Sequence, residues 1–305
     1  MKNTTITAIG LMVLGMILIP VGDSIAKYVL NVTPYSPQFV AWVRFLIGGL
    51  VVLPFALRGT TFNWLDVHFL KKQLLRAVLI VLTVVTIIKA VGLSPIADVF
   101  GAFFVGPILS VVLSSLVLRE RATWLEWASV VIGFVGVLLV VQPAVITQFT
   151  TLSEENIFGQ TQTSKLGVYC ALLAGIFYGS FLTATRWAAT SGPPMVQVAV
   201  QFLLAALILT PFGLYELFQT GVHQPELLLA NGVTSVVANL LSILALARAR
   251  PATLAPVVYM QVVAATFIGV FVFQETLSVL ATLGISIIIF SGVLRFDFKS
   301  LYARK

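Results

Sequence analysis

Long runs of apolar residues, separated by short polar segments, extend along the whole chain. A helix needs about 20 mainly apolar residues to cross the hydrocarbon core of a bilayer. Several connections, such as residues 248–250, are so short that the helices on either side must form tight antiparallel hairpins. The pattern predicts an all-α integral membrane protein with ten transmembrane helices, at residues 7–29, 38–56, 74–93, 95–118, 123–141, 166–188, 195–215, 226–248, 251–274 and 278–296.

The composition supports this class. Of the 305 residues, 59% are hydrophobic and 10% are charged, whereas a soluble domain carries about 25% charged residues. A chain this apolar has too few polar groups to cover a water-facing surface, so the lipid bilayer must be its main solvent. The single cysteine, Cys170, excludes a disulfide framework within the chain, and the spacing of cysteine and histidine predicts no metal site. We expect neither a metal nor a cofactor.

Basic residues are distributed unevenly over the connections between the predicted helices. With the N-terminus inside, the outer connections contain one basic residue, Lys165, and the positive-inside rule then predicts that both termini are cytoplasmic. This distribution accounts for the net charge of +7 without a nucleic-acid partner. The basic residues on the inner side are Lys2, Arg58, Lys71, Lys72, Arg76, Arg119, Arg121, Arg186, Arg248, Arg250, Arg295, Lys299, Arg304 and Lys305.

The two halves of the chain resemble each other. "PQFVAWVRFLIGGLVVLPF" (37–55) aligns without a gap on "PMVQVAVQFLLAALILTPF" (194–212), and Arg44 then faces Gln201. Five helices per half is an odd number, so the second half must enter the membrane in the opposite sense. We predict two inverted five-helix repeats, 1–141 and 166–305, joined by an external linker at 142–165. Such repeats are typical of secondary transporters, which bind substrate near the midplane; the alternative is a duplicated structural bundle that transports nothing.

Four segments carry a resemblance to a known family: "GDSIAKYVL" (22–30), "RFLIGGLVVLPF" (44–55), "GPILSVVLSSLVLRER" (106–121) and "WASVVIGFVGVLLV" (127–140). Over residues 7–296 the chain resembles the ten-helix, two-EamA-domain branch of the drug/metabolite transporter superfamily. The resemblance implies a carrier of the bacterial cytoplasmic (inner) membrane, with a central cavity lined mainly by helices 1–4 and 6–9. Helices 5 and 10 would lie outside and support packing or a homodimer. The pattern is similar to the S-adenosylmethionine carriers; neighbouring branches move riboflavin or export amino acids.

Five ionisable residues lie in the outer third of the predicted N-terminal unit: Asp23, Lys27, Arg44, Lys89 and Asp98. A charge at the centre of a membrane helix costs about 2.5–3.5 kcal/mol on insertion scales, so these groups should face a cavity and pair with one another. Asp23 and Lys27 are four residues apart, in the order that favours an ion pair on one helix face. Arg44 either binds a carboxylate or phosphate of the substrate or pairs with an aspartate as an outer-gate latch. Asp23 and Asp98 are also candidate proton sites.

The C-terminal unit offers neutral polar and aromatic side chains in place of these charges. Such a combination suits a zwitterion, or an aromatic heterocycle with an anionic group. The candidate substrate-binding residues are Arg44, Trp42, Phe104, Tyr178, Gln201, Asn239, Tyr259 and Gln261.

Together these features predict a secondary-active transporter that moves a small organic metabolite, favouring the S-adenosylmethionine type, by alternating access. A riboflavin carrier or an amino-acid or drug exporter of the same superfamily is the alternative. A membrane-embedded enzyme or a passive channel is the more distant one. The sequence leaves open whether transport is driven by a proton or by a counter-substrate.

Overall fold

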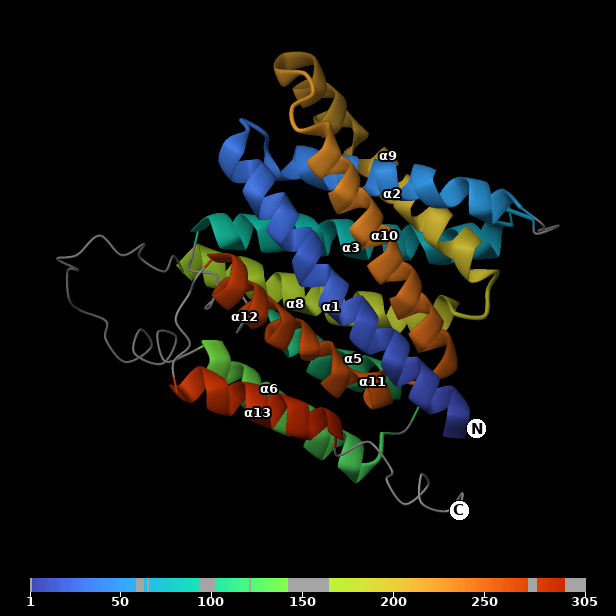
Figure 1. Ribbon diagram of the computed structural model, residues 1–305. Coiled ribbons are helices and arrows are strands. Elements are labelled where there is room, and N and C mark those ends of the chain that lie inside the picture. Colours follow the sequence, from blue (N-terminus) through green and yellow to red (C-terminus); the bar gives the residue numbers. More distant parts are fainter. Residues whose placement is uncertain are drawn as a thin grey trace.

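The computed structural model describes residues 2–58, 63–64, 66–93, 102–120, 122–141, 165–273 and 279–293. The secondary structure of these residues is entirely helical (Figure 1), which confirms the all-α class. The helices are α1 (Lys2–Val32), α2 (Pro37–Leu57), α3 (Val67–Leu93), α5 (Val105–Val117), α6 (Trp124–Val141), α8 (Lys165–Ala188), α9 (Pro194–Thr220), α10 (Pro225–Arg248), α11 (Pro251–Val258), α12 (Met260–Phe273) and α13 (Val279–Val293).

Seven helical stretches within the described residues are long and apolar enough to cross a bilayer: Thr4–Leu30, Pro37–Leu57, Val67–Ala90, Leu166–Ala188, Pro194–Thr220, Pro225–Arg248 and Pro251–Ile268. Three shorter apolar helices, Val105–Val117, Trp124–Leu139 and Thr282–Ser291, lie in the other three predicted spans. The first part of the predicted span 95–118 falls mostly in residues 94–101, which lie outside the described residues. The protein is therefore a multi-pass membrane protein.

Proline marks the starts of four helices. Pro37, Pro194, Pro225 and Pro251 each occupy the first helical turn, where the missing N–H has no intrahelical partner to lose. Ser36 caps α2, because its hydroxyl accepts a hydrogen bond from the backbone N–H of Phe39 at 3.2 Å. These signals place helix starts close to the sequence-based boundaries.

The ninth predicted span, 251–274, is not one uninterrupted helix. It consists of two helices, α11 and α12, interrupted at Tyr259. Pro256 lies inside α11, and it removes one backbone donor and crowds the carbonyl four residues earlier. The predicted span is confirmed, since Pro251–Ile268 is apolar and long enough in total to cross the membrane.

The helices form a closed ring with one peripheral pair. In order, the neighbours around the ring are α1, α10, α2, α9, α3, α8, α5 and α11, with α11 and α12 returning to α1. α6 and α13 pack mainly on each other and lie at one edge of the bundle (Figure 1), as the resemblance implied for helices 5 and 10. If the two halves are inverted repeats, α1 corresponds to α8 and α3 corresponds to α10. The contact of α1 with α10 then corresponds to the contact of α8 with α3, and both contacts are present. The division into two repeats stays a prediction that these contacts support.

Small residues bring α2 and α9 into close contact along their length. A Cβ added at Gly48 would meet the Phe202 ring at 2.6 Å, and one added at Gly213 would run into the Trp42 indole. Phe45 and Phe202 pack edge to face, with ring centroids 5.4 Å apart. In a membrane, where burial from lipid gives little driving force, such close packing is a main source of helix association.

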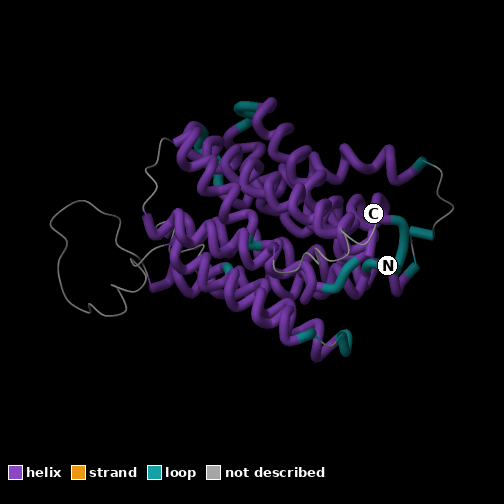
Figure 2. Tube along the Cα trace, turned by 60° about the horizontal axis from the view of Figure 1, so that its bottom comes forward, coloured by secondary structure: helices purple, strands orange, loops and turns teal. Residues whose placement is uncertain are grey.

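Apart from α11 and α12, which together make one span, successive helices run in opposite directions, so their connections lie at the two ends of the bundle (Figure 2). One end holds the start of α1 and the residues Arg58, Lys71, Lys72, Arg119, Arg186, Arg248 and Arg250, and we call it the basic end. The other holds the turns 33–36 and 221–224, and we call it the Tyr35 end. There the Tyr35 hydroxyl donates to the carbonyl of Gly221 at 3.1 Å, and the carboxylate of Glu216 accepts hydrogen bonds from Ser36.

Candidate functional site

A central cavity of about 550 Å³ lies inside the helix ring. Its walls come from α1, α2, α3, α8, α9, α10 and α12, together with Phe103, which precedes α5. Small-molecule sites typically enclose about 300–1,000 Å³ and combine apolar walls with a few polar groups. This cavity has the size and mixed character of such a site. Its polar and ionisable lining residues are Asp23, Tyr35, Arg44, Thr83, Tyr178, Ser235, Asn239, Ser242 and Gln261.

An ion pair between α1 and α2 forms the charged part of the cavity wall. Arg44 Nη1 lies 2.8 Å from Asp23 Oδ1. The Arg44 side chain is 14% exposed and that of Asp23 is 45% exposed, so both remain accessible from the cavity. Among the residues that the structure describes, Asp23 is the carboxylate paired with Arg44. The side chain of Lys27 and the whole of Asp98, the other proposed partners, lie outside the described part.

Two amide groups with free hydrogen-bonding capacity lie deeper in the cavity. Asn239 Oδ1 on α10 and Gln261 Nε2 on α12 are buried and have no hydrogen-bond partner within the described residues. Asn239 is one helical turn farther from the Tyr35 end than Ser235, which lies beside Gly22 of α1. Since an unpartnered buried polar atom is costly, this acceptor and this donor are well suited to binding a polar ligand.

Aromatic rings form another part of the wall. The Tyr178 ring lies 5.1 Å from that of Phe103 and 6.3 Å from that of Phe181, measured between centroids. All three residues line the cavity, and the Tyr178 hydroxyl lies 3.9 Å from the sulfur of Met16. Around them are aliphatic side chains of α3, including Ile80 and Ile87. A planar ring of a ligand could stack here.

Four of the predicted substrate-binding residues do not line the cavity: Trp42, Phe104, Gln201 and Tyr259. Trp42 donates from Nε1 to Thr210 Oγ1 at 3.3 Å and packs on α9. Phe104 packs edge to face on Tyr259, with centroids 5.8 Å apart. Gln201 is fully buried, and neither its amide oxygen nor its nitrogen has a partner among the described residues.

The other four predicted substrate-binding residues, Arg44, Tyr178, Asn239 and Gln261, do line the cavity, and so does Asp23 of the predicted charge cluster. Lys89 of that cluster is exposed near the end of α3.

The sequence-based candidates did not include several lining residues: Tyr35, Phe45, Thr83, Phe181, Ser235 and Ser242. A signal for two of them was available. Ser235 and Ser242 lie four residues before and three residues after Asn239, so all three share one face of α10. Once Asn239 is taken as a candidate, helical periodicity selects both serines.

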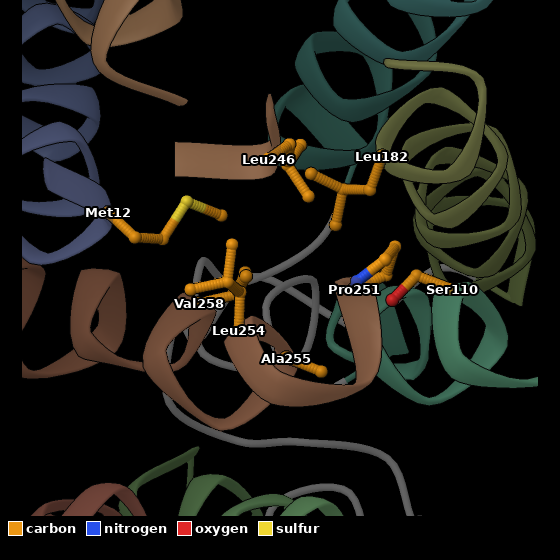
Figure 3. Close-up of a pocket in the computed structure, with 8 residues that line it drawn as sticks. All are labelled: Met12, Ser110, Leu182, Leu246, Pro251, Leu254, Ala255 and Val258. Carbon is orange, nitrogen blue, oxygen red and sulfur yellow. The ribbon is translucent and has the colours of Figure 1, made fainter. Parts of the chain in front are cut away.

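Apolar side chains close the bundle between the cavity and the basic end. Figure 3 shows Met12, Leu182, Leu246, Leu254 and Val258 pointing toward a common centre, with Ser110, Pro251 and Ala255 at its margin. The gap between them is too narrow for a water molecule. In this conformation the cavity therefore extends toward the Tyr35 end and is closed toward the basic end.

Ion pairs reinforce this closure. Arg186 of α8 binds Glu120 Oε1 through Nε at 3.0 Å and through Nη2 at 2.8 Å. The same guanidinium donates to the carbonyl of Leu246, at the end of α10, at 2.9 Å. Arg250 pairs with Glu126 at 3.3 Å. At the basic end, the contacts of Arg186 tie α8, α10 and the segment after α5 together, and the contact of Arg250 ties the α10–α11 connection to α6.

Within the part of the chain that the structure describes, no group of three His, Cys, Asp or Glu side chains is placed to hold a metal ion. The chemistry that the cavity supports is recognition, through one ion pair, two unpartnered amide atoms and an aromatic wall.

Comparison with known proteins supplies the family. The model of the EamA-like transporter family matches residues 6–142 and 165–295, on either side of the predicted linker. A crystal structure of another protein shares the fold with a TM-score of 0.73 at 17% identity, and the match covers 100% of this chain and 99% of the other.

Curated relatives are more distant in sequence. Those from Rickettsia conorii and Rickettsia felis are both named S-adenosylmethionine uptake transporter and are 23% identical, over 60% and 67% of this chain. An uncharacterized transporter of Acidianus ambivalens is 30% identical over 58% of the chain. The matches span 63%, 72% and 62% of these three relatives, respectively.

Proposed function

The chain belongs to the EamA-like transporter family, and we propose that it carries a small metabolite with an α-amino-acid head group across a membrane by alternating access. Membership of this family makes the protein a membrane transporter of a small molecule and not an enzyme. The observation that carries the proposal is the Asp23–Arg44 ion pair in the cavity wall.

This ion pair is complementary to a zwitterion. A guanidinium binds a carboxylate with two parallel, charge-assisted hydrogen bonds, and a free carboxylate can accept from an ammonium group. When a zwitterion inserts between Asp23 and Arg44, each protein charge exchanges one partner of opposite sign for another. A simple anion would instead leave Asp23 unpaired in a partly buried site, which is costly.

The deeper part of the cavity favours a ligand that continues into a polar aromatic group. Tyr178 supplies a ring for stacking, Asn239 an acceptor and Gln261 a donor. Asparagine and glutamine amides recognise adenine through the same combination of one acceptor and one donor. S-adenosylmethionine combines an α-amino-acid group with an adenine ring, and the names of the Rickettsia relatives support it as the first compound to test.

The charge distribution supports an orientation. Since basic connections face the cytoplasm, the basic end would be the cytoplasmic side and both termini would be cytoplasmic. The bacterial relatives from Rickettsia support the bacterial inner membrane as the location. The cavity then extends toward the outside, and the closure at Met12, Leu246 and Leu254 is the inner gate. During transport, the two units 1–141 and 166–305 would rock against each other, which would open the cavity toward the basic end and close it toward the Tyr35 end.

The test is ligand-dependent thermal stability of the detergent-purified protein. S-adenosylmethionine, S-adenosylhomocysteine, riboflavin, amino acids and dicarboxylates are compared on wild type, Arg44→Gln and Arg58→Gln. A ligand that binds the folded state raises the unfolding temperature. Arg58 is an exposed arginine just after the same helix, so it controls for lost charge. We expect a compound with an α-amino-acid group to stabilise wild type and Arg58→Gln but not Arg44→Gln, and then to show saturable flux in liposomes. Stabilisation by riboflavin alone would contradict the proposal.

A further inference from the structure

Arg76 is a buried cation that the cavity does not use. The sequence pattern counted it with the basic residues of the inner connections, but it lies inside α3 and has no exposed surface. Its guanidinium donates to Gln73 Oε1 at 2.6 Å, to Thr185 Oγ1 of α8 at 3.2 Å and to Gln197 Oε1 of α9 at 3.4 Å. We call these four residues the Arg76 cluster. It joins three helices near the basic end.

The cluster has donors without acceptors. Arg76 Nη2 and Gln73 Nε2 are both buried and have no hydrogen-bond partner among the described residues. The amide of Gln73 has a defined orientation, because its oxygen accepts from Arg76 and its nitrogen must then point elsewhere. Gln197 uses its own nitrogen to bind the carbonyls of Ala189 and Gly192. The unmet requirement in the cluster is therefore for an acceptor.

The charge of the cluster is also uncompensated within the described residues. Arg44 pairs with Asp23, Arg186 with Glu120 and Arg250 with Glu126, whereas no described carboxylate pairs with Arg76. Neutral oxygens of amides and a hydroxyl solvate a guanidinium, but they do not balance its charge. A cluster that served only to join α3 to α8 and α9 would not need the cation, since burying an unpaired charge is costly.

The cluster lies just beyond the floor of the cavity. Ile80, one turn along α3 from Arg76, lines the cavity, and so does Phe181, one turn along α8 from Thr185. The Arg76 guanidinium carbon lies 5.9 Å from the centroid of the Phe181 ring. The same aromatic side chain thus contacts the cavity and the cation.

We propose that the Arg76 cluster is a second anion site, separate from Arg44, which binds one small monovalent anion. Two sources share this chemistry: a halide ion, or a carboxylate of a transported molecule that passes Phe181 on its way to the basic end. The anion accepts from Arg76 Nη2 and Gln73 Nε2. Binding of a halide is independent of the substrate proposed above, and only the carboxylate source depends on it.

The experiment measures the unfolding temperature of the purified protein at constant ionic strength while sodium isethionate, a salt with a bulky anion, is replaced by sodium chloride, bromide or formate. The variants are Arg76→Gln, Gln73→Glu and, as the matched control, Arg248→Gln. Arg248 is exposed at the same end and donates to the carbonyl of Leu244 on its own helix. Gln73→Glu places a permanent carboxylate beside Arg76 without changing side-chain shape.

We expect a saturable rise in unfolding temperature for wild type and Arg248→Gln, and its loss in Arg76→Gln. In Gln73→Glu, the unfolding temperature should be high in isethionate and no longer respond to added anion. A response to halides alone identifies an inorganic anion, and a response to formate alone identifies a carboxylate. Wild type that responds to none of the salts, or a response that persists in Gln73→Glu, would overturn the proposal. Because Gln73→Glu is itself decisive, the test survives if Arg76→Gln fails to fold.

Discussion

The Asp23–Arg44 pair makes different predictions as a binding group and as a gate latch. At 4 Å and an effective dielectric constant of 20, two unit charges attract by about 4 kcal/mol, whereas exposed pairs measure about 0.2–1 kcal/mol. With one side chain 45% and the other 14% exposed, the coupling should be about 1–2 kcal/mol. Asp23→Asn and Arg44→Gln should each lower stability, and the double variant should recover part of that loss.

Ligand affinity separates the two roles. Loss of the hydrogen bonds between Arg44 and a substrate carboxylate should cost about 1.5–3 kcal/mol, which raises Kd about 10- to 100-fold. For a zwitterion, Asp23→Asn also weakens binding, because the ammonium loses its partner. For a simple carboxylate, Asp23→Asn strengthens binding, because Asp23 no longer competes for Arg44.

The assay is calorimetric titration of the stabilising compound into wild type, both single variants, the double variant and Arg58→Gln. The reasoning about the binding role fails if Arg44→Gln and the double variant keep wild-type affinity. In that case Arg44 only holds α1 to α2. If Arg44→Gln binds weakly and Asp23→Asn binds more tightly, the arginine role stands and the zwitterion is wrong.

Three further predictions follow from other contacts. Gly213→Ala should lower stability by about 1–3 kcal/mol, because the new methyl group meets the Trp42 indole; thermal unfolding compared with that of Gly10→Ala, at an exposed helical glycine where a methyl group would meet nothing within 4 Å, measures it. Glu120→Gln should weaken the Arg186 contact and so increase the labelling of a cysteine introduced at Leu254 by a membrane-impermeant reagent added at the basic end. Unchanged labelling would show that the apolar side chains around Leu254 close the bundle without this ion pair. Asn239→Leu should raise Kd for an adenine-bearing ligand about tenfold, since a polar partner is lost, without affecting an aliphatic amino acid; equal loss for both compounds would contradict the assignment of Asn239 to the ring.

Hydropathy predicted the elements of this fold well, because crossing a membrane requires a fixed length of apolar sequence. It could not predict how each helix is rotated. Trp42 and Arg44 are two residues apart on α2, and one packs on α9 while the other lines the cavity. Helices that are apolar on all sides lack the one-sided pattern that identifies a buried face.

The alignment of the two halves had the same limit. It paired Gln201 with Arg44, but Arg44 lines the cavity and Gln201 does not. In an alternating-access carrier, equivalent residues of inverted repeats occupy different environments in any single state, so a sequence match cannot give equivalent exposure. Arg76 shows a second limit of the sequence. Its position near a helix end suggested a charge exposed to water, but the structure buries its side chain completely.

The α2–α9 contact constrains how such a carrier can move. Gly48, at the middle of α2, receives the Phe202 ring, and Gly213, in the last third of α9, receives the Trp42 indole. Two helices fitted together at two points resist sliding along each other, but the units 1–141 and 166–305, to which they belong, could still rotate about the contact between them. A covalent cross-link between α2 and α9 should then leave transport intact, whereas one between α1 and α3, which both line the cavity but do not pack closely on each other, should stop it.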